Sequence, residues 1–152
     1  MLIADYHQTL ERVLVETSGR TVVSFGDTAT AVYRSAREAV VAAATLQRAL
    51  AERAWRRDLP IRVTVALDSG EVVATGHGYF GEAVNRCACL CDHSRGAQVL
   101  LSEATRNLLE GEDLGELELM QVDERPLAPG GRPLRVYQLI VPGLPAPAES
   151  AV

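Results

Sequence analysis

Residues 20–50 read RTVVSFGDTATAVYRSAREAVVAAATLQRAL, and this stretch carries the signals that decide the fold. Two extended segments, 20–25 and 28–33, flank Gly26-Asp27, a dipeptide typical of tight turns, and together they predict an antiparallel hairpin. Ser35 followed by Glu38 forms a capping box, which predicts the start of a helix that runs to about residue 54. A hairpin followed by a long amphipathic helix indicates a domain in which helices pack on a sheet.

The rest of the chain continues this alternation of strands and helices. We expect helices at 5–18, 82–93 and 102–109, strands at 61–67, 98–101, 116–122 and 134–141, a continuation or partner strand at 71–74, and a glycine-rich loop at 75–81. The pattern predicts an α+β (mixed α/β) domain with a mostly antiparallel sheet and helices on one face. Residues 1–142 form this domain, and the Pro/Ala-rich residues 143–152 are expected to be a disordered tail.

Composition excludes several classes of function. The chain has 152 residues, a mass of 16.4 kDa and a formal net charge of −5, so nothing in it suggests a nucleic-acid or anionic-membrane surface. All of its basic residues are arginines, which excludes a phosphate-loop lysine or a Schiff-base lysine. We expect a cytoplasmic protein without a membrane span, because no apolar run is long enough and no signal peptide is visible.

Cys87, Cys89 and Cys91 lie close together and suggest a metal cluster at first sight. On the helix expected here, Cys87 and Cys91 share a face while Cys89 points elsewhere. Structural zinc sites pair close cysteines with a second, distant pair of ligands, and the sequence offers no such pair. The cysteines therefore do not predict a zinc site or a disulfide framework.

Four motifs occur in an order that resembles the class III nucleotidyl (adenylate/guanylate) cyclase catalytic domain. They are the Gly-Asp of the hairpin, SGEVV at 69–73, YFGEAVNR at 79–86 and GAQVLLSE at 96–103, and the resemblance extends from about residue 5 to residue 141. It implies a ferredoxin- or palm-like sheet and a dimer packed head to tail, either a homodimer or a heterodimer with another cyclase-like chain. In the family, two aspartates hold Mg²⁺ or Mn²⁺ and the nucleotide is ATP or GTP.

The resemblance can be carried over position by position. One metal aspartate matches Asp27, which as a hairpin residue could instead be only a turn former. The ribose-orienting asparagine matches Asn85, which could equally be a packing residue. The purine-reading lysine and aspartate fall on Val23 and Gly78, neither of which can make the same contact. The arginine that neutralises the transferring phosphate falls on Cys89, which carries no charge.

The chain also departs from the family at its start, where the first metal aspartate and a phosphate-binding turn are expected on a central first strand. Residues 1–5 are too few to supply that strand, so the resemblance is to a degenerate and N-terminally truncated domain. Without the strand, the hairpin and the 61–67 strand are each left with an unpaired edge. We expect these edges to close on each other, or a partner chain to fill the gap, or the natural start to lie upstream.

Three functions remain open. The first is a non-catalytic module for dimerisation or regulation of signalling, because four of the family's roles have lost their residues. The second is an active nucleotidyl cyclase, or a subunit that completes one with a partner chain. The third is a sensor that binds a nucleotide or another small molecule in the cleft between two chains.

Overall fold

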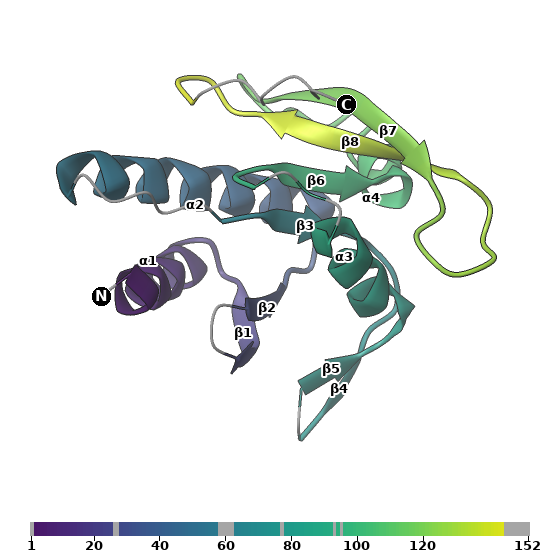
Figure 1. Cartoon of the computed structure of the whole chain (residues 1–152), viewed down its shortest axis with the longest axis horizontal. Helices are drawn as coiled ribbons and strands as arrows, with labels where there is room; N and C mark the ends of the chain where they lie inside the picture. The colour runs from purple at the N-terminus through teal and green to yellow at the C-terminus, as the bar shows by residue number, and fades with distance from the viewer. Residues whose placement is uncertain are drawn as a thin grey trace.

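A computed structural model describes residues 2–25, 28–57, 63–76, 78–92, 94 and 96–144, and side chains within 6–19, 28–52, 63–76, 78–92, 94 and 96–144 (Figure 1). The helices of this part are α1 (Leu2–Glu16), α2 (Ala36–Arg57), α3 (Glu82–Asp92) and α4 (Glu103–Leu108). The strands are β1 (Arg20–Phe25), β2 (Thr28–Val32), β3 (Val65–Leu67), β4 (Val73–Thr75), β5 (Gly78–Phe80), β6 (Val99–Ser102), β7 (Glu118–Arg125) and β8 (Leu134–Ile140). None of the described helices is both long and apolar enough to traverse a bilayer.

The largest sheet has the strand order β3-β6-β8-β7. β3 runs parallel to β6, whereas β8 pairs antiparallel with both of its neighbours. All four residues of β6 are buried, which is expected of a strand with a neighbour on each side and helices on its faces. The predicted fold class, an α+β domain with a mostly antiparallel sheet, is confirmed.

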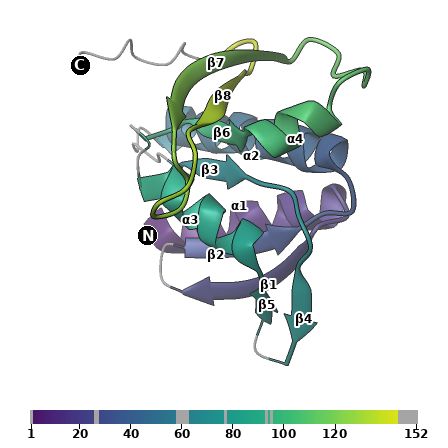
Figure 2. The same cartoon turned by 90° about the vertical axis from the view of Figure 1, so that its right-hand side faces the viewer.

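The helices do not all lie on one face of this sheet, in contrast to our expectation. Val99 and Leu101 of β6 pack with Val40 and Ala43 of α2, whereas Leu100, between them in sequence, packs with Leu90 of α3. Side chains alternate between the faces of a strand, so α2 and α3 cover opposite faces. Figure 2 shows β3 and β6 between these two helices.

The β1–β2 hairpin is a separate two-stranded sheet. α1 packs against α2 through a second core that includes Tyr6, Leu10, Val13, Leu14, Leu46 and Leu50. Gly19 joins α1 to the hairpin at a close approach, since a side chain there would overlap the ring of Tyr33. The Tyr33 hydroxyl and the Thr17 hydroxyl are 2.7 Å apart and share a hydrogen bond, which fixes the hairpin against the end of α1.

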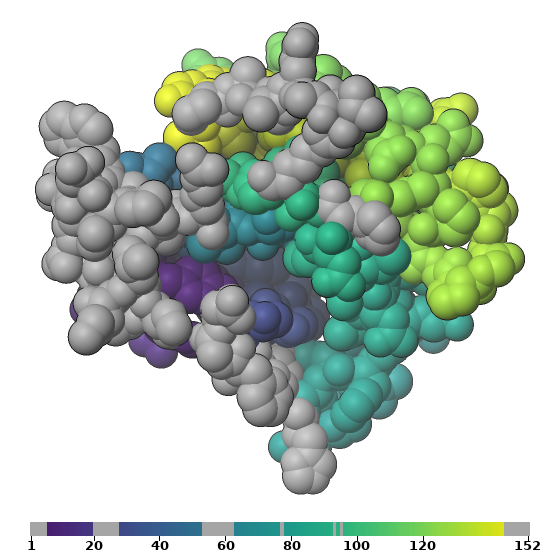
Figure 3. Space-filling model, in the orientation of Figure 1, coloured from purple at the N-terminus to yellow at the C-terminus, as the bar shows by residue number. Residues whose placement is uncertain are grey.

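The hairpin and β3 do not close on each other. No described strand pairs with the second edge of β3, and the side chains from Val63 to Leu67 are all only half-buried. Figure 2 shows β2 across from β3, and Figure 3 shows the surface hollowed between the hairpin and the segment that holds β3 and α3. The first of our three expectations for the unpaired edges, mutual closure, is therefore wrong within the described part of the chain.

Two further expectations need correction, and others lie outside the described residues. The expected loop at 75–81 contains β5, which pairs with β4 in a short antiparallel hairpin. The first helix begins at Leu2 rather than at residue 5. The start of the 61–67 strand, the end of the 82–93 helix at residue 93 and residues 145–152 of the tail expected at 143–152 lie outside the described residues. Leu144, within that expected tail, is described and packs against the core.

Candidate functional site

α3 carries two of the positions that sequence reasoning selected. Asn85 is exposed on the second turn of the helix. Cys89, one turn later, is half-buried and packs against the cluster formed by Leu90, Leu100, Leu127 and Val136. The position one helical turn from Asn85 therefore holds an uncharged side chain that contributes to an apolar core.

The other selected positions lie on the two hairpins. Val23 is in β1, opposite Thr30 of β2, and its side chain lies outside the described part of the structure. Gly78 is buried at the start of β5 with a φ of 134°, a conformation that strongly favours glycine. β5 lies beside β1, so the strands of Val23 and Gly78 are neighbours. Asp27, the candidate metal ligand, lies outside the described residues.

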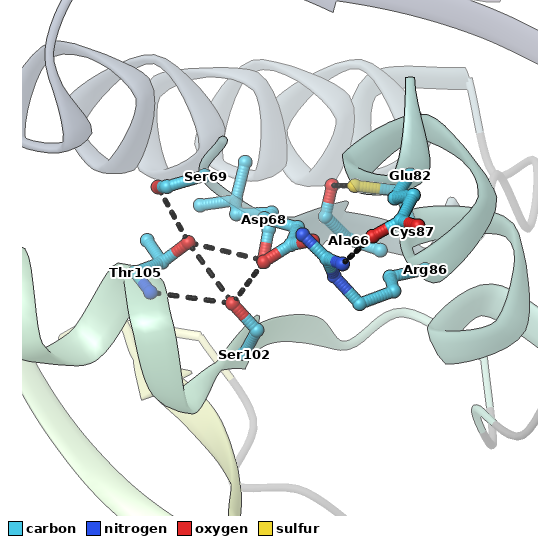
Figure 4. Close-up of polar contacts among 9 residues, drawn as sticks. Ala66, Asp68, Ser69, Glu82, Arg86, Cys87, Ser102 and Thr105 are labelled. Atoms are coloured by element: carbon cyan, nitrogen blue, oxygen red, sulfur yellow. Dashed lines mark hydrogen bonds and ion pairs between the residues drawn. The ribbon is translucent and has the colours of Figure 1, made fainter. Parts of the chain in front are cut away.

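Asp68, at the carboxyl end of β3, is the centre of a buried polar network (Figure 4). Its side chain is 0% exposed, and one carboxylate oxygen, Oδ2, accepts a hydrogen bond from Nε of Arg86 at 2.5 Å. The other oxygen, Oδ1, accepts from the Ser102 hydroxyl at 2.5 Å. A buried carboxylate is stable only when charge and hydrogen bonds compensate it, and Arg86 and Ser102 supply both.

The network continues from Ser102 into the start of α4. The backbone N–H of Thr105 donates to the Ser102 hydroxyl at 3.2 Å, so Ser102 is the N-cap of α4, as its place before this helix predicts. The Thr105 hydroxyl lies 2.9 Å from that of Ser69, directly after Asp68. These hydrogen bonds connect the end of β3, the end of β6, α3 and α4.

The guanidinium group of Arg86 binds within this network. It bonds to the buried Asp68 and lies 3.5 Å from Glu82, a carboxylate that is 91% exposed. Neighbouring residues on a helix point about 100° apart, so Arg86 and Asn85 face different directions. Arg86 therefore does not replace the arginine that the cyclase resemblance expects at Cys89.

Cys87 faces the same network but is not a reactive thiol. Its Sγ donates a weak hydrogen bond to the backbone carbonyl of Ala66 at 3.6 Å. Burial, followed by the nearby charge of Asp68, raises the pKa of Cys87 to about 12. Because the thiolate is the nucleophilic form, a pKa this high means that Cys87 stays protonated and unreactive at neutral pH.

The described residues do not fit the divalent ions that the cyclase fold implies. Within this part of the chain, no group of three or more His, Cys, Asp or Glu side chains could hold a metal ion. The carboxylate oxygens of the fully buried Asp68 are already bonded to Arg86 and Ser102. A hard cation needs several free oxygen ligands, and this network does not offer them.

Sequence reasoning missed Asp68, which directly follows the strand expected at 61–67. The available signal was a single acidic residue directly after an apolar strand, in a chain with an arginine on the helix expected to pack nearby. A carboxylate at such a place must be compensated. Which of the chain's many arginines compensates it depends on tertiary packing, and sequence alone does not determine that.

The curated proteins that match this chain in sequence are uncharacterized. No family model matches the chain. Uncharacterized proteins of Mycobacterium tuberculosis and Mycobacterium bovis are 34% identical over 119 residues, which is 78% of this chain. The chain spans only 39% of the length of these curated relatives, so they extend well beyond the domain described above.

Solved structures with a similar fold are cyclases. Adenylate cyclases of Trypanosoma brucei in their monomeric state match 97% of this chain and 82% of theirs, with a TM-score of 0.78 and 22% identity. An adenylate/guanylate cyclase/hydrolase of Silicibacter pomeroyi matches 91% and 81%, with a TM-score of 0.73 and 21% identity. The adenylyl cyclase CyaB of P. aeruginosa matches 91% and 80%, with a TM-score of 0.70 and 18% identity. The chain therefore has the fold of the catalytic domain of adenylate and guanylate cyclases.

Proposed function

We propose that this chain is a non-catalytic cyclase-like domain that acts in dimerisation or in regulation of signalling. The observation that carries the proposal is the environment of Cys89, which lies one helical turn from the exposed Asn85 and packs into an apolar cluster. A transferring phosphate develops negative charge, and stabilisation of that charge is the largest single contribution of most such sites. A neutral, half-buried thiol cannot provide it.

The size of the effect supports the proposal. Loss of one charge-stabilising donor typically costs about 2.7–4 kcal/mol of transition-state stabilisation, or roughly 10²–10³ in rate. The nearest arginine along α3, Arg86, is neutralised by Asp68. Val23 and Gly78 replace the two purine-reading side chains, which weakens the case for binding of ATP or GTP as well.

The competing function is a nucleotidyl cyclase that another chain completes, with Mg²⁺ or Mn²⁺ as its metal. It is favoured by Asn85, which is exposed on α3 where a partner chain or a ribose could reach it. In that arrangement Asp27 would bind the metal ion and the partner would contribute the missing cation.

A turnover assay distinguishes these functions. Purified protein is incubated with ATP or GTP and Mg²⁺ or Mn²⁺, and 3′,5′-cyclic product is measured by mass spectrometry. We expect no product above a protein-free blank. Metal-dependent product that disappears in Asp27→Ala would overturn the proposal. A nucleotide-induced rise in melting temperature without product would instead support a sensor.

A further inference from the structure

β7 forms an outer edge of the large sheet. It is the last strand in the order β3-β6-β8-β7, and β8 is its only partner among the described strands. β7 is also the longest of these strands, with eight residues from Glu118 to Arg125, and Figures 1 and 2 both show it on the side of the domain away from α1. Natural proteins usually keep open edges short or cover them, because the unpaired backbone groups of an open edge can pair with another extended chain. An open edge of this length is therefore a candidate docking site.

The first half of β7 is the regular part of this edge. Glu118 to Gln121 pair one to one with β8, and the register shifts between Gln121 and Asp123. Beyond the shift, the backbone N–H of Glu124 donates to the Asp123 carboxylate at 2.7 Å, so the chain satisfies one of its own edge groups there. A docking strand would therefore pair with residues 118–121, which are called the β7 edge below.

An apolar side chain lies within the β7 edge. Met120 is 46% exposed and lies opposite Gln138 of β8. Leu100 of β6 pairs with Gln138 and packs with Leu90 of α3, so Met120 lies on the face of the sheet that α3 covers. α3 packs on β3 and β6, and Met120 on the outer strand stays open to solvent. A strand added to β7 would remove this apolar surface from water, which favours binding.

The charge around the β7 edge is strongly negative. Residues 103–124 contain eight acidic residues and one arginine, a net charge of −7, whereas the whole chain carries −5. The remainder of the chain therefore has a small positive charge. Within the described part of the chain, five carboxylates of this stretch have no arginine within 4.0 Å: Glu112, Asp113, Glu116, Glu118 and Glu124.

We propose that the β7 edge docks an extended segment of another protein that carries arginine at alternate positions. Backbone hydrogen bonds to the β7 edge supply affinity in such an added strand, and its side chains supply specificity. Successive side chains of a strand point to opposite faces, so alternate arginines line up on one face. The aliphatic part of an arginine can cover Met120 while its guanidinium group meets Glu116 or Glu118.

The charge favours a basic segment over a second copy of this chain. Two β7 edges that paired with each other would bring the carboxylates of Glu116 and Glu118 close to the same groups of the other copy. Like charges across a strand pair are destabilising, whereas opposite charges stabilise it. The inference does not depend on the proposed function, because the β7 edge is the same in a silent domain and in an active cyclase.

The probe is a fluorescently labelled peptide as long as β7 in which arginine and valine alternate. Its binding to the natural chain is measured by anisotropy at low and at high salt. We expect saturable binding that weakens as salt rises, because the charges at the edge are exposed. A peptide with glutamate in place of arginine should not bind. A peptide in which arginine and proline alternate keeps the charge but lacks half of the backbone N–H donors, and it should bind about tenfold more weakly.

A pair of double variants locates the site. Glu116→Gln/Glu118→Gln removes two carboxylates at the β7 edge, and Glu11→Gln/Glu16→Gln removes two from α1, where both are also exposed. Both changes alter the net charge equally. We expect the dissociation constant of the arginine–valine peptide to rise about tenfold in the first variant and less than about twofold in the second. The melting temperature of each variant checks that the domain still folds.

Hydrogen exchange gives a readout that does not depend on charge. The backbone amides of residues 118–121 should exchange more slowly when the peptide is bound, and those of α1 should not change. No binding of the arginine–valine peptide by the natural chain would overturn the proposal, as would equal losses of affinity in the two double variants. Equal binding of the arginine–proline peptide would contradict strand pairing. Protection of the β7 edge that grows with protein concentration alone would identify a second copy as the occupant and overturn the basic partner.

Discussion

Replacement of Arg86 by methionine should destabilise the domain by about 3 kcal/mol. The change keeps most of the aliphatic length of the side chain but removes the charge that compensates Asp68. Asp68 is 0% exposed, so its carboxylate would remain buried with only the Ser102 hydroxyl to stabilise it.

The magnitude follows from the burial of the two partners. Removal of one member of a buried ion pair costs about 3–5 kcal/mol. Arg86 is itself 26% exposed, and the hydrogen bond from Ser102 is retained, so we expect the lower end of this range. For a chain of this length, about 3 kcal/mol corresponds to a fall of about 6–12 °C in melting temperature.

Urea denaturation followed by circular dichroism measures the effect, and Glu82→Gln is the matched control. Glu82 also contacts Arg86, but it is 91% exposed, and such surface pairs contribute about 0–1 kcal/mol. In a double-mutant cycle, Asp68→Asn should remove most of the penalty of Arg86→Met, because no uncompensated charge remains buried. If Arg86→Met cost no more than Glu82→Gln, the buried pair would not have the role assigned to it.

Three further predictions concern the surroundings of this network. Ser102→Ala should lower the free energy of unfolding by about 2 kcal/mol in a urea titration, because Ser102 both caps α4 and donates to Asp68. Ser35→Ala, which removes an exposed cap only, should lower it by about 1 kcal/mol, and equal losses in the two variants would contradict this. Leu101→Ala, at a fully buried position of β6, should lower the free energy of unfolding by about 2–5 kcal/mol in the same assay. A loss below about 1 kcal/mol would show that Leu101 is not part of the core. The free energy of unfolding should fall above about pH 9, because the Cys87 thiol ionises near 9.0 when unfolded but only near 12 when folded. The fall in urea midpoint between pH 8 and pH 10.5 should be smaller in Cys87→Ala, and an identical fall would show that this thiol is not buried as described.

Much of the fold is predictable because local signals and tertiary packing agree. The alternation of 20–25 and 28–33 around a turn gives β1 and β2, and the Ser35 hydroxyl accepts from the backbone N–H of Glu38 at 3.1 Å, as the capping box predicts. Ser102 likewise caps α4. These signals depend on a few neighbouring residues, so sequence alone carries them.

The features that were not predicted depend on residues far apart in the sequence. The glycine-rich residues 75–81 predict a loop, but β5 is a strand because β4 supplies the pairing. We expect α3 on the same face of the sheet as α2, but the two helices cover opposite faces. Val99 and Leu101 of β6 pack on the α2 side and Leu100 packs on the α3 side, and this is visible only when the neighbours of the strand are known. The pairing of Asp68 with Arg86 also depends on tertiary packing, so the sequence alone does not reveal it.

The candidate site was only partly accessible to sequence reasoning. Family resemblance selected Asn85 and Cys89, and the structure places them one turn apart on α3, one exposed and one in an apolar cluster. The resemblance did not indicate that Arg86, between them, is sequestered by a buried carboxylate. The roles of Val23, Gly78 and Asp27 stay predictions that mutagenesis must test.

The most direct test of the central claim is the rate of cyclic nucleotide formation by the natural chain compared with Asn85→Ala in the same preparation. Asn85 is exposed, so its replacement should leave the fold intact. With ATP or GTP and Mn²⁺, the account predicts that both proteins give product only at the level of a blank without protein. A rate well above the blank for the natural chain, lost in Asn85→Ala, would show that the domain is a working cyclase and would contradict the account.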